Sequence, residues 1–356
     1  MNRVLLPLLL FAGLVATEPS PVSAPDVRLQ VVPAVVYKVD DPGGTRTSSF
    51  VFDIAVICST DCELTPVSAS VELSSAGSAV ERQDWTTEML ARIKRTSFRL
   101  EPNTPVMAPV RAIALPEAFE LRFYFRRPQA LAIDSVTLRL ALADAKGRRA
   151  EQMLRIPIGY YRQKTTLNFP IRGHGIIGQD YVTNGGHGGH GDFSDEFGID
   201  IDGLDRNDGE LSDANENAAD AGWGREILAP AAGTVVYARN DVPTNPHPGE
   251  APGDDWYRPL HDPVNASAGN CVIIDHGNSE YSVMMHMQPG SVTVKVGDRV
   301  ATGQVIGRLG NSGDAFGPHL HYQLQSGPRL WQYQSMPVKF QNVDSPLHRG
   351  EYFVAK

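Results

Sequence analysis

The residues best suited to chemistry lie from His174 onward, where all ten histidines of the chain occur. In "GPHLHYQL", His319 and His321 are two residues apart in a run typical of a β-strand, and a strand directs residues i and i+2 to one face. The run "YSVMMHMQPG" places His286 on one face of a second strand by the same alternation, and Asp200 ends the hydrophobic part of "FGIDID". An open zinc site uses about three nitrogen or oxygen ligands, and a neighbouring imidazole can hold a proton. These residues therefore predict a zinc-dependent hydrolytic site.

The motifs around these residues are similar to those of the lysostaphin/LytM-type zinc metallopeptidases, which cut the peptides of bacterial cell walls. The resemblance is carried by "EFGIDI", "ILAPAAGTVVYARN", the hairpin "VKVGDRVATGQVIG" and the approach "GNSGDAFGPHLHYQL", which occur in the order of the family. It covers most of residues 165–325 and does not extend to residues 25–160. It implies a LytM-like β-sheet metallopeptidase domain at residues 165–345.

Position by position, the resemblance implies that Asp200 and His321 bind one Zn2+ per chain and that His286 and His319 are the catalytic residues. Zinc would polarise the scissile carbonyl and activate a water near neutral pH, while the two histidines handle the proton and the oxyanion. The expected substrate is a peptide, above all the peptide cross-links of peptidoglycan.

The third zinc ligand is where the sequence departs from the commonest family pattern, His-x-x-x-Asp, because Glu196 takes the place of that histidine. His190 lies ten residues and His187 thirteen residues before Asp200, in a Gly-rich segment able to fold back onto the strand. Glu196 would share a face with Asp200 if the strand were regular. A second carboxylate would weaken the Lewis acidity of zinc, so we favour His190 and keep His187 and Glu196 as alternatives.

The elements that precede this half are predicted to be strands. From residue 25 to 160, short runs such as "LQVVPAVVYKV" and "FELRFYF" alternate with Gly, Pro, Asp and Ser breaks. This spacing is typical of an all-β, immunoglobulin-like β-sandwich, with at most one short helix near "WTTEMLARI". We interpret it as an accessory spacer or recognition domain. The acidic segment 202–220 and the Pro-rich segment 241–268 are predicted surface insertions, and residues 346–356 a C-terminal tail.

Residues 1–24 have the charge, apolar core and small-residue end of a secretory signal, which predicts export to the periplasm or outside the cell. The apolar run from Val4 to Ala16 is shorter than the roughly 20 residues of a spanning helix, so no transmembrane segment is expected in the mature protein. Export would permit a disulfide between Cys58 and Cys62, whereas Cys271 reads as a buried small hydrophobic residue.

Three other functions are less well supported than the enzyme. The net charge of −9 argues against nucleic-acid binding. Some relatives have lost ligands and instead bind and activate cell-wall amidases, but the presence of Asp200, His286, His319 and His321 favours catalysis here. The hairpin also resembles lipoyl and biotinyl carriers, yet the comparable "VMMHM" offers no lysine for modification.

Overall fold

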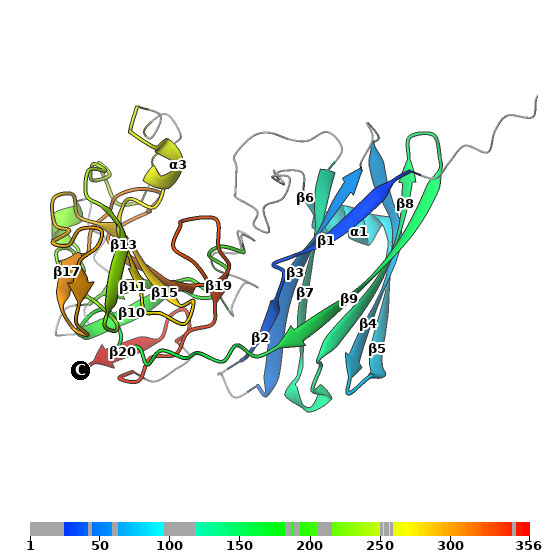
Figure 1. The fold of residues 1–356 in the computed structure, drawn as a ribbon, viewed down its shortest axis with the longest axis horizontal. Helices are drawn as coiled ribbons and strands as arrows, with labels where there is room; N and C mark the ends of the chain where they lie inside the picture. Colours follow the sequence, from blue (N-terminus) through cyan, green and yellow to red (C-terminus); the bar gives the residue numbers. More distant parts are fainter. Residues whose placement is uncertain are drawn as a thin grey trace, which may run out of the picture.

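The computed structural model describes residues 25–41, 45–58, 63–95, 118–181, 187, 193–204, 216–249, 252, 256, 259–343 and 347–356. Strands dominate these residues and form two large sheets, one from each half of the chain (Figure 1). Across the same ranges, no helix is long and apolar enough to cross a membrane. The predicted signal segment lies outside the described residues. Of the predicted all-β fold, the coarser part is confirmed: the described residues form mostly strands, while the immunoglobulin-like sandwich stays a prediction.

The N-terminal half forms one nine-stranded sheet in the order β5-β4-β8-β9-β2-β3-β7-β6, with β1 pairing β3. Strands β2 and β9 pair in parallel, and this pair joins two antiparallel groups into a continuous, curled sheet. The elements are β1 (Val27–Val32), β2 (Val36–Asp40), β3 (Thr47–Cys58), β4 (Leu64–Ser75), β5 (Ser78–Thr86), α1 (Thr87–Ile93), β6 (Lys94–Arg95), β7 (Ala118–Pro128), η1 (Gln129–Leu131), β8 (Ser135–Asp144) and β9 (Arg149–Gly159).

Aromatic side chains fill the core of this sheet. Phe52 and Phe123 face each other across β3 and β7 with ring centroids 5.4 Å apart, and Phe50 and Phe125 do the same at 5.3 Å. All four rings are buried, because positions two apart in a strand share a face. The alternating pattern seen in the sequence thus supplies a core that is independent of the second sheet.

The three cysteines of the chain behave differently. Cys58, at the end of β3, is disulfide-bonded, and Cys62 lies outside the described residues. Cys271 is free and buried, and burial raises the pKa of its thiol to about 12. This confirms that Cys271 is a core residue, because a thiol with so high a pKa is not a nucleophile near neutral pH.

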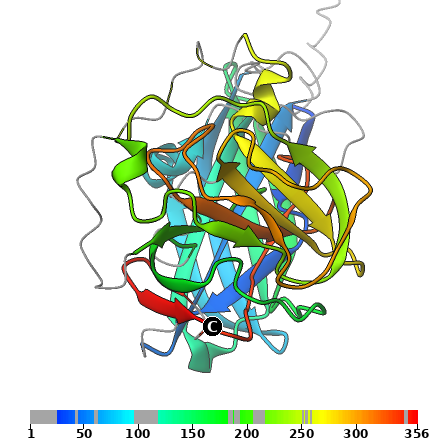
Figure 2. The same cartoon turned by 90° about the vertical axis from the view of Figure 1, so that its left-hand side faces the viewer.

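The C-terminal half forms a second nine-stranded sheet in the order β16-β13-β14-β15-β18-β11-β10-β20, with β19 pairing β18 and a separate β12–β17 pair. Figure 2 shows this sheet in front, with β20 in red at its lower edge. The residues predicted as a tail thus include a strand. The elements are β10 (Gly173–Gln179), β11 (Ile199–Gly203), η3 (Asn217–Ala219), β12 (Glu226–Leu228), β13 (Gly233–Arg239), α3 (Pro263–Ala266), β14 (Asn270–Asp275), β15 (Tyr281–Met287), β16 (Arg299–Val300), β17 (Val305–Arg308), β18 (Leu320–Gln325), β19 (Ser335–Met336) and β20 (Tyr352–Ala355).

The central strands of this sheet are covered on both faces. Every residue of β18 is buried, and so is every residue of β15 after Tyr281. One face contributes Met284 and Tyr322 to the larger core, while the other face carries Met285 and a smaller apolar cluster. Polar side chains on these strands are therefore held away from bulk water. Electrostatic interactions are stronger in such a buried environment than in water.

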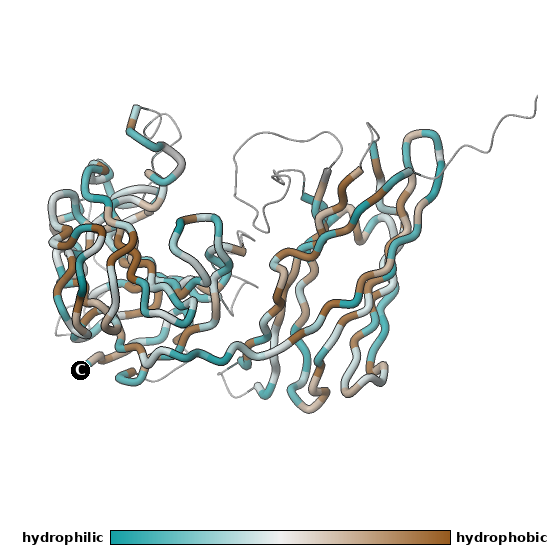
Figure 3. Tube along the Cα trace, viewed as in Figure 1, coloured by the Kyte–Doolittle hydropathy of each residue, from teal (hydrophilic) through white to brown (hydrophobic). Residues whose placement is uncertain are grey.

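The first part of the segment between β9 and β10, residues 160–166, is hydrophilic (Figure 3) and is fixed to the second sheet. The carboxylate of Glu280, which is fully buried, accepts hydrogen bonds from the backbone N–H of Lys164 at 2.7 Å and of Thr165 at 2.6 Å. It also accepts one from the hydroxyl of Tyr161. The connecting segment is therefore anchored by a side chain of the sheet that follows it.

Strand β2 and the residues before it also contact the second half of the chain. The ring of Tyr37 lies 6.4 Å from that of Phe197, measured between centroids, and 5.2 Å from that of Tyr161. The side-chain amide of Gln334 donates to the carbonyl of Val35 at 2.6 Å. The two sheets thus meet near the residues that lead into β11 and β19.

Candidate metal centre

Strands β11 and β18 bring Asp200 and His321 together. The two residues are directly opposite each other in the antiparallel register, so their side chains point to the same face of the sheet. His321 Nδ1 lies 3.1 Å from Asp200 Oδ1. Two residues that are 121 positions apart in the sequence therefore meet because of strand pairing alone.

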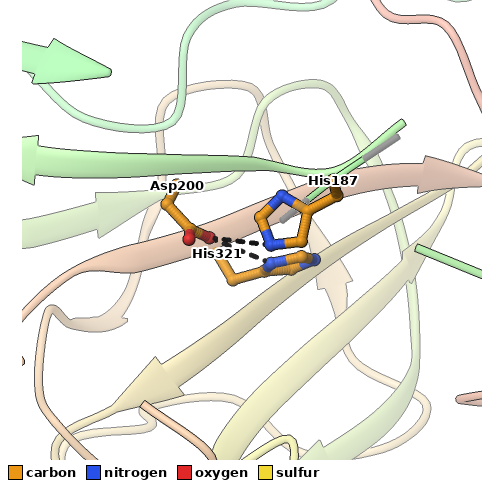
Figure 4. Close-up of side chains that lie close together, drawn as sticks. All are labelled: His187, Asp200 and His321. Carbon is orange, nitrogen blue, oxygen red and sulfur yellow. Dashed lines mark hydrogen bonds and ion pairs between the residues drawn. The ribbon is translucent and has the colours of Figure 1, made fainter. Parts of the chain in front are cut away.

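His187 completes the group (Figure 4). Its Nε2 lies 3.6 Å from Asp200 Oδ1, and its ring meets that of His321 edge-on with centroids 4.7 Å apart. One ligand atom from each of His187, Asp200 and His321 lies within 4.8 Å of the others, and all three residues are buried. His190, the histidine favoured from sequence, lies outside the described residues. The choice of His190 as the third zinc ligand therefore stays a prediction.

Glu196 is placed differently from the sequence-based expectation. It lies in a turn at residues 193–197, before β11 begins at Ile199, so the strand rule that would put it on the face of Asp200 does not apply. Its backbone carbonyl accepts a hydrogen bond from the backbone N–H of His187 at 2.9 Å. Glu196 thereby helps to hold His187 beside the sheet through its main chain.

Gly198 allows the close approach of the ligands. Its carbonyl lies 3.2 Å from Nδ1 of His187. A Cβ at this position would lie 2.6 Å from Cε1 of His321, which is closer than such atoms approach. Glycine is therefore required here, because the imidazole of one proposed ligand packs on the backbone that orients the other.

The donor set suits a zinc ion. A carbonyl can only accept, so His187 carries its proton on Nδ1 and turns the lone pair of Nε2 toward the Asp200 carboxylate. A lone pair facing an anionic oxygen calls for a cation between them. Two imidazoles and one carboxylate are also the ligand types and the number found in open, catalytic zinc sites.

The charge states fit the same use. Burial pushes the pKa of Asp200 up, but the combined pull of His187, His319 and His321 is stronger and leaves that pKa well below its usual range. Burial lowers the pKa of His187 to about 4, although Asp200 opposes this shift. The carboxylate is thus ionised and His187 neutral near pH 7, which are the forms that bind metals.

His319 stands next to this group. Its Nε2 lies 3.6 Å from Asp200 Oδ1, and its Nδ1 lies 2.9 Å from the carbonyl of Gly317. Its ring is 4.8 Å from that of His286, measured between centroids. The His-x-His pair of the sequence therefore supplies one residue to the candidate metal group and one to its flank.

His286 reaches the site through a β-bulge that alternation does not predict. Asn270 pairs with Met287 and Val272 with Met284, so β15 has one residue more than β14 between these pairs. His286 has a φ of 63°, in the left-handed region. Regular alternation would put it on the face of Met284, in the larger core, whereas the bulge turns it toward His319.

Hydrogen bonding and burial define the state of His286. Its Nδ1 lies 2.8 Å from the carbonyl of Ser312 and must donate to it. Burial, followed by the neighbouring His319 and His321, lowers the pKa of His286 well below that of a free histidine. Its Nε2 is therefore a proton acceptor in the resting protein.

Asp202 belongs to this neighbourhood and was not identified from sequence. It follows Asp200 by two residues in β11, and burial raises the pKa of its carboxyl to about 7, with His319 opposing and Asp200 adding to the shift. The repeated "IDID" was the available signal, since two acids at i and i+2 share one face of a strand.

The Pro-rich insertion is attached to the loop that leads to His319. Asn245 is fully buried, and its side-chain amide donates to Oδ1 of Asn311 and to the carbonyls of Gly313 and Ala315, all at 2.9–3.0 Å. Only part of this insertion is described. The part that is described supports the loop that carries the catalytic candidate.

The C-terminal half of the chain is similar to a family of known peptidases. Residues 217–334 match the model of Peptidase family M23, a range that contains His286, His319 and His321 but begins after Asp200. The peptidoglycan DD-endopeptidase ShyA of Vibrio cholerae is 39% identical over 85 residues, which are 20% of this chain and 19% of that protein. ShyC of the same organism, also a peptidoglycan DD-endopeptidase, is 35% identical over 108 residues, 24% of each.

A solved structure is similar as well. The catalytic domain of lysostaphin from Staphylococcus simulans is 19% identical, with a TM-score of 0.25, and the match covers 46% of this chain and 86% of that one. The chain thus spans about a fifth to a quarter of the length of the two curated relatives. The C-terminal portion of this chain carries a Peptidase family M23 domain at residues 217–334.

Proposed function

We propose that the chain is an exported zinc metalloendopeptidase that hydrolyses peptide cross-links of peptidoglycan, with one zinc ion held by His187, Asp200 and His321. The observation that carries the proposal is the buried His–Asp–His group, whose ligand atoms lie within 4.8 Å of one another and whose His321 belongs to the M23 match. The two Vibrio relatives support the substrate class, since both are named peptidoglycan DD-endopeptidases.

The chemistry divides between the metal and two histidines. A bound zinc ion would polarise the scissile carbonyl and make water a nucleophile near neutral pH. His286 and His319 each face a backbone carbonyl through Nδ1, so each presents Nε2 as a proton acceptor. A ring that has taken the proton of the attacking water can donate it to the leaving amine or hydrogen bond to the oxyanion.

The deciding experiment measures zinc content and chelator-reversible hydrolysis of purified sacculi. The wild type should hold about one zinc per chain and lose activity when the zinc is removed. Zinc bound without any hydrolysis would contradict the enzyme and favour the alternative, a regulator that activates cell-wall amidases.

The ligand assignment has its own test. His187→Ala should abolish zinc binding, while His190→Ala and Glu196→Ala should retain it, because the geometry brings His187 to Asp200. Loss of zinc in His190→Ala with full retention in His187→Ala would overturn the assignment.

For the N-terminal half, we propose an immunoglobulin-like accessory domain at residues 25–160 that precedes the catalytic domain at residues 165–345. Its support is the predominance of strands and the separate aromatic core. In this view residues 1–24 direct export. A fragment of residues 25–160 that fails to fold alone would contradict the domain boundary.

A further inference from the structure

Two glutamines continue the line of the candidate metal ligand along β18. Gln323 and Gln325 follow His321 at two-residue intervals, so all three side chains share one face of the strand. Both glutamines are fully buried. Burying an amide in the centre of a sheet costs free energy unless the amide is hydrogen-bonded. The proposed chemistry does not use either glutamine directly.

The direction of the hydrogen bonds can be read from the far end of this line. Gln325 Nε2 donates to the carbonyls of Gly327 at 2.6 Å and Arg329 at 3.1 Å, and carbonyls accept only. Its Oε1 therefore accepts from Gln323 Nε2 at 2.8 Å. Gln323 Nε2 also donates to the carbonyl of Ser194 at 2.8 Å. Flipping either amide would set oxygens against oxygens, so both orientations are fixed.

This order determines which nitrogen of His321 carries the proton. The remaining oxygen of Gln323, Oε1, lies 2.9 Å from His321 Nε2 and must accept a hydrogen bond from it. A histidine binds a metal in its neutral form, which has one N–H, so with Nε2 protonated the lone pair of that form lies on Nδ1. Nδ1 lies 3.1 Å from Asp200 Oδ1, on the side of the ring where a metal would bind.

We propose that Gln323 and Gln325 are positioning residues that lock His321 in the Nε2–H tautomer and so keep the metal site open. Without them, His321 would carry its proton on Nδ1 and donate it to Asp200, a charge-assisted bond that a metal would have to break. With them, the neutral ring of His321 turns its Nδ1 lone pair toward the space beside Asp200, where a cation would be bound by both residues. The inference rests on the proposed zinc site and adds the residues that prepare it.

The test uses full-length protein and two readouts: zinc affinity by chelator competition, and the imidazole 15N signals of His321 in zinc-free protein. Wild type should show Nε2–H. Gln323→Met, which fills the space but accepts no hydrogen bond, should show Nδ1–H and bind zinc 10–100-fold more weakly, about the range for loss of an outer-shell partner. Gln325→Met should change zinc affinity in the same direction by a smaller factor.

Two controls separate positioning from simple core disruption. Gln323→Glu keeps an oxygen for His321 Nε2 but turns its second oxygen toward the carbonyl of Ser194 and Gln325 Oε1. It should therefore be less stable than wild type, yet retain the tautomer and bind zinc more tightly than Gln323→Met. Ser282→Ala removes a buried hydroxyl from β15 that bonds to Tyr322 and His276, and it should leave both readouts unchanged.

The outcomes distinguish this inference from the proposed function. If wild type binds no zinc, the proposed zinc site fails. If wild type binds zinc and Gln323→Met matches it in both affinity and tautomer, the zinc site stands and the positioning role is overturned. Should Gln323→Met not fold, the comparison of Gln325→Met with wild type decides. An unchanged tautomer of His321 and an unchanged zinc affinity in Gln325→Met would then overturn the positioning role.

Discussion

His286 combines an unusual backbone conformation with a buried imidazole. Its φ of 63° is tolerated by asparagine and glycine but is strained for β-branched residues. His286→Asn should therefore fold with a stability close to wild type and lose most hydrolytic activity, whereas His286→Val should lose activity and also about 1–3 kcal/mol of stability. Urea unfolding together with sacculus hydrolysis checks both. Equal stability of the two variants would contradict the strain argument.

His187 makes the stability of the zinc-free protein depend on pH. Its folded pKa of about 4 is below the ordinary value of 6.5, so the unfolded chain binds more protons between these values. The stabilising contribution is complete above about pH 6.5 and is lost as the pH falls toward 4, by about 3 kcal/mol in total. The free energies of unfolding of zinc-free wild type and His187→Gln should therefore converge or cross as the pH falls. Parallel pH profiles would refute the shift.

Part of this site could be predicted from the sequence, and the rest depends on folding that the sequence pattern does not show. The family resemblance pointed to Asp200 and His321, and the structure places them opposite each other. The choice among His187, His190 and Glu196 depends on how a Gly-rich segment folds back and on a turn that delays β11, which residue spacing does not encode. The bulge at His286 depends on pairing with a neighbouring strand, so alternation along one strand does not show it.

At the scale of elements, the turn at residues 193–197 serves both proposed histidine ligands. Together with Gly198 it supplies the carbonyls that contact His187 and Gln323. Ser335 of β19 fastens this turn: its Oγ donates to the carbonyl of Phe193 at 3.1 Å and accepts from the backbone N–H of Phe197 at 3.0 Å. A strand that carries no ligand therefore fixes the geometry of two of them.

Ser335→Ala should weaken zinc binding without removing a ligand. The change leaves the buried N–H of Phe197 without its partner, which costs about 1–3 kcal/mol. We expect a lower thermal midpoint and a several-fold loss of zinc affinity by chelator competition. Ser282→Ala, a buried serine of the same sheet, should lower the midpoint alone. Equal zinc affinity in the two variants would contradict the role of the turn.

The strands were easier to predict from the sequence than the way in which they pair. The β-rich runs and the short helix near "WTTEMLARI" correspond to β1–β4, β7–β9 and α1, whereas β5 and β6 were not identified from sequence. The continuous sheet depends on the parallel pairing of Val36 with Ile158, residues far apart in the chain. Such pairings follow from the whole topology, which local patterns do not specify.

At the scale of the whole molecule, Glu280 controls the connection between the sheets. Glu280→Ala removes the acceptor for the backbone of Lys164 and Thr165, so the connecting segment should detach and become accessible to trypsin at Arg162 and Lys164. Limited proteolysis read by mass spectrometry should show this cut in the variant and much slower cleavage in wild type. Glu226→Ala, which removes an exposed carboxylate, is the control. Rapid cleavage of wild type at these bonds would contradict the anchor.

The anchored connection changes how the distance between the two halves should be understood. A free linker is a tether, and its length sets how far one domain can wander from the other. Here the chain is bound to Glu280 soon after it leaves β9, and Tyr37 rests on Phe197 just ahead of β11. The first sheet is therefore held at a set distance from the candidate metal centre, and lengthening the chain after Thr165 should not change that distance.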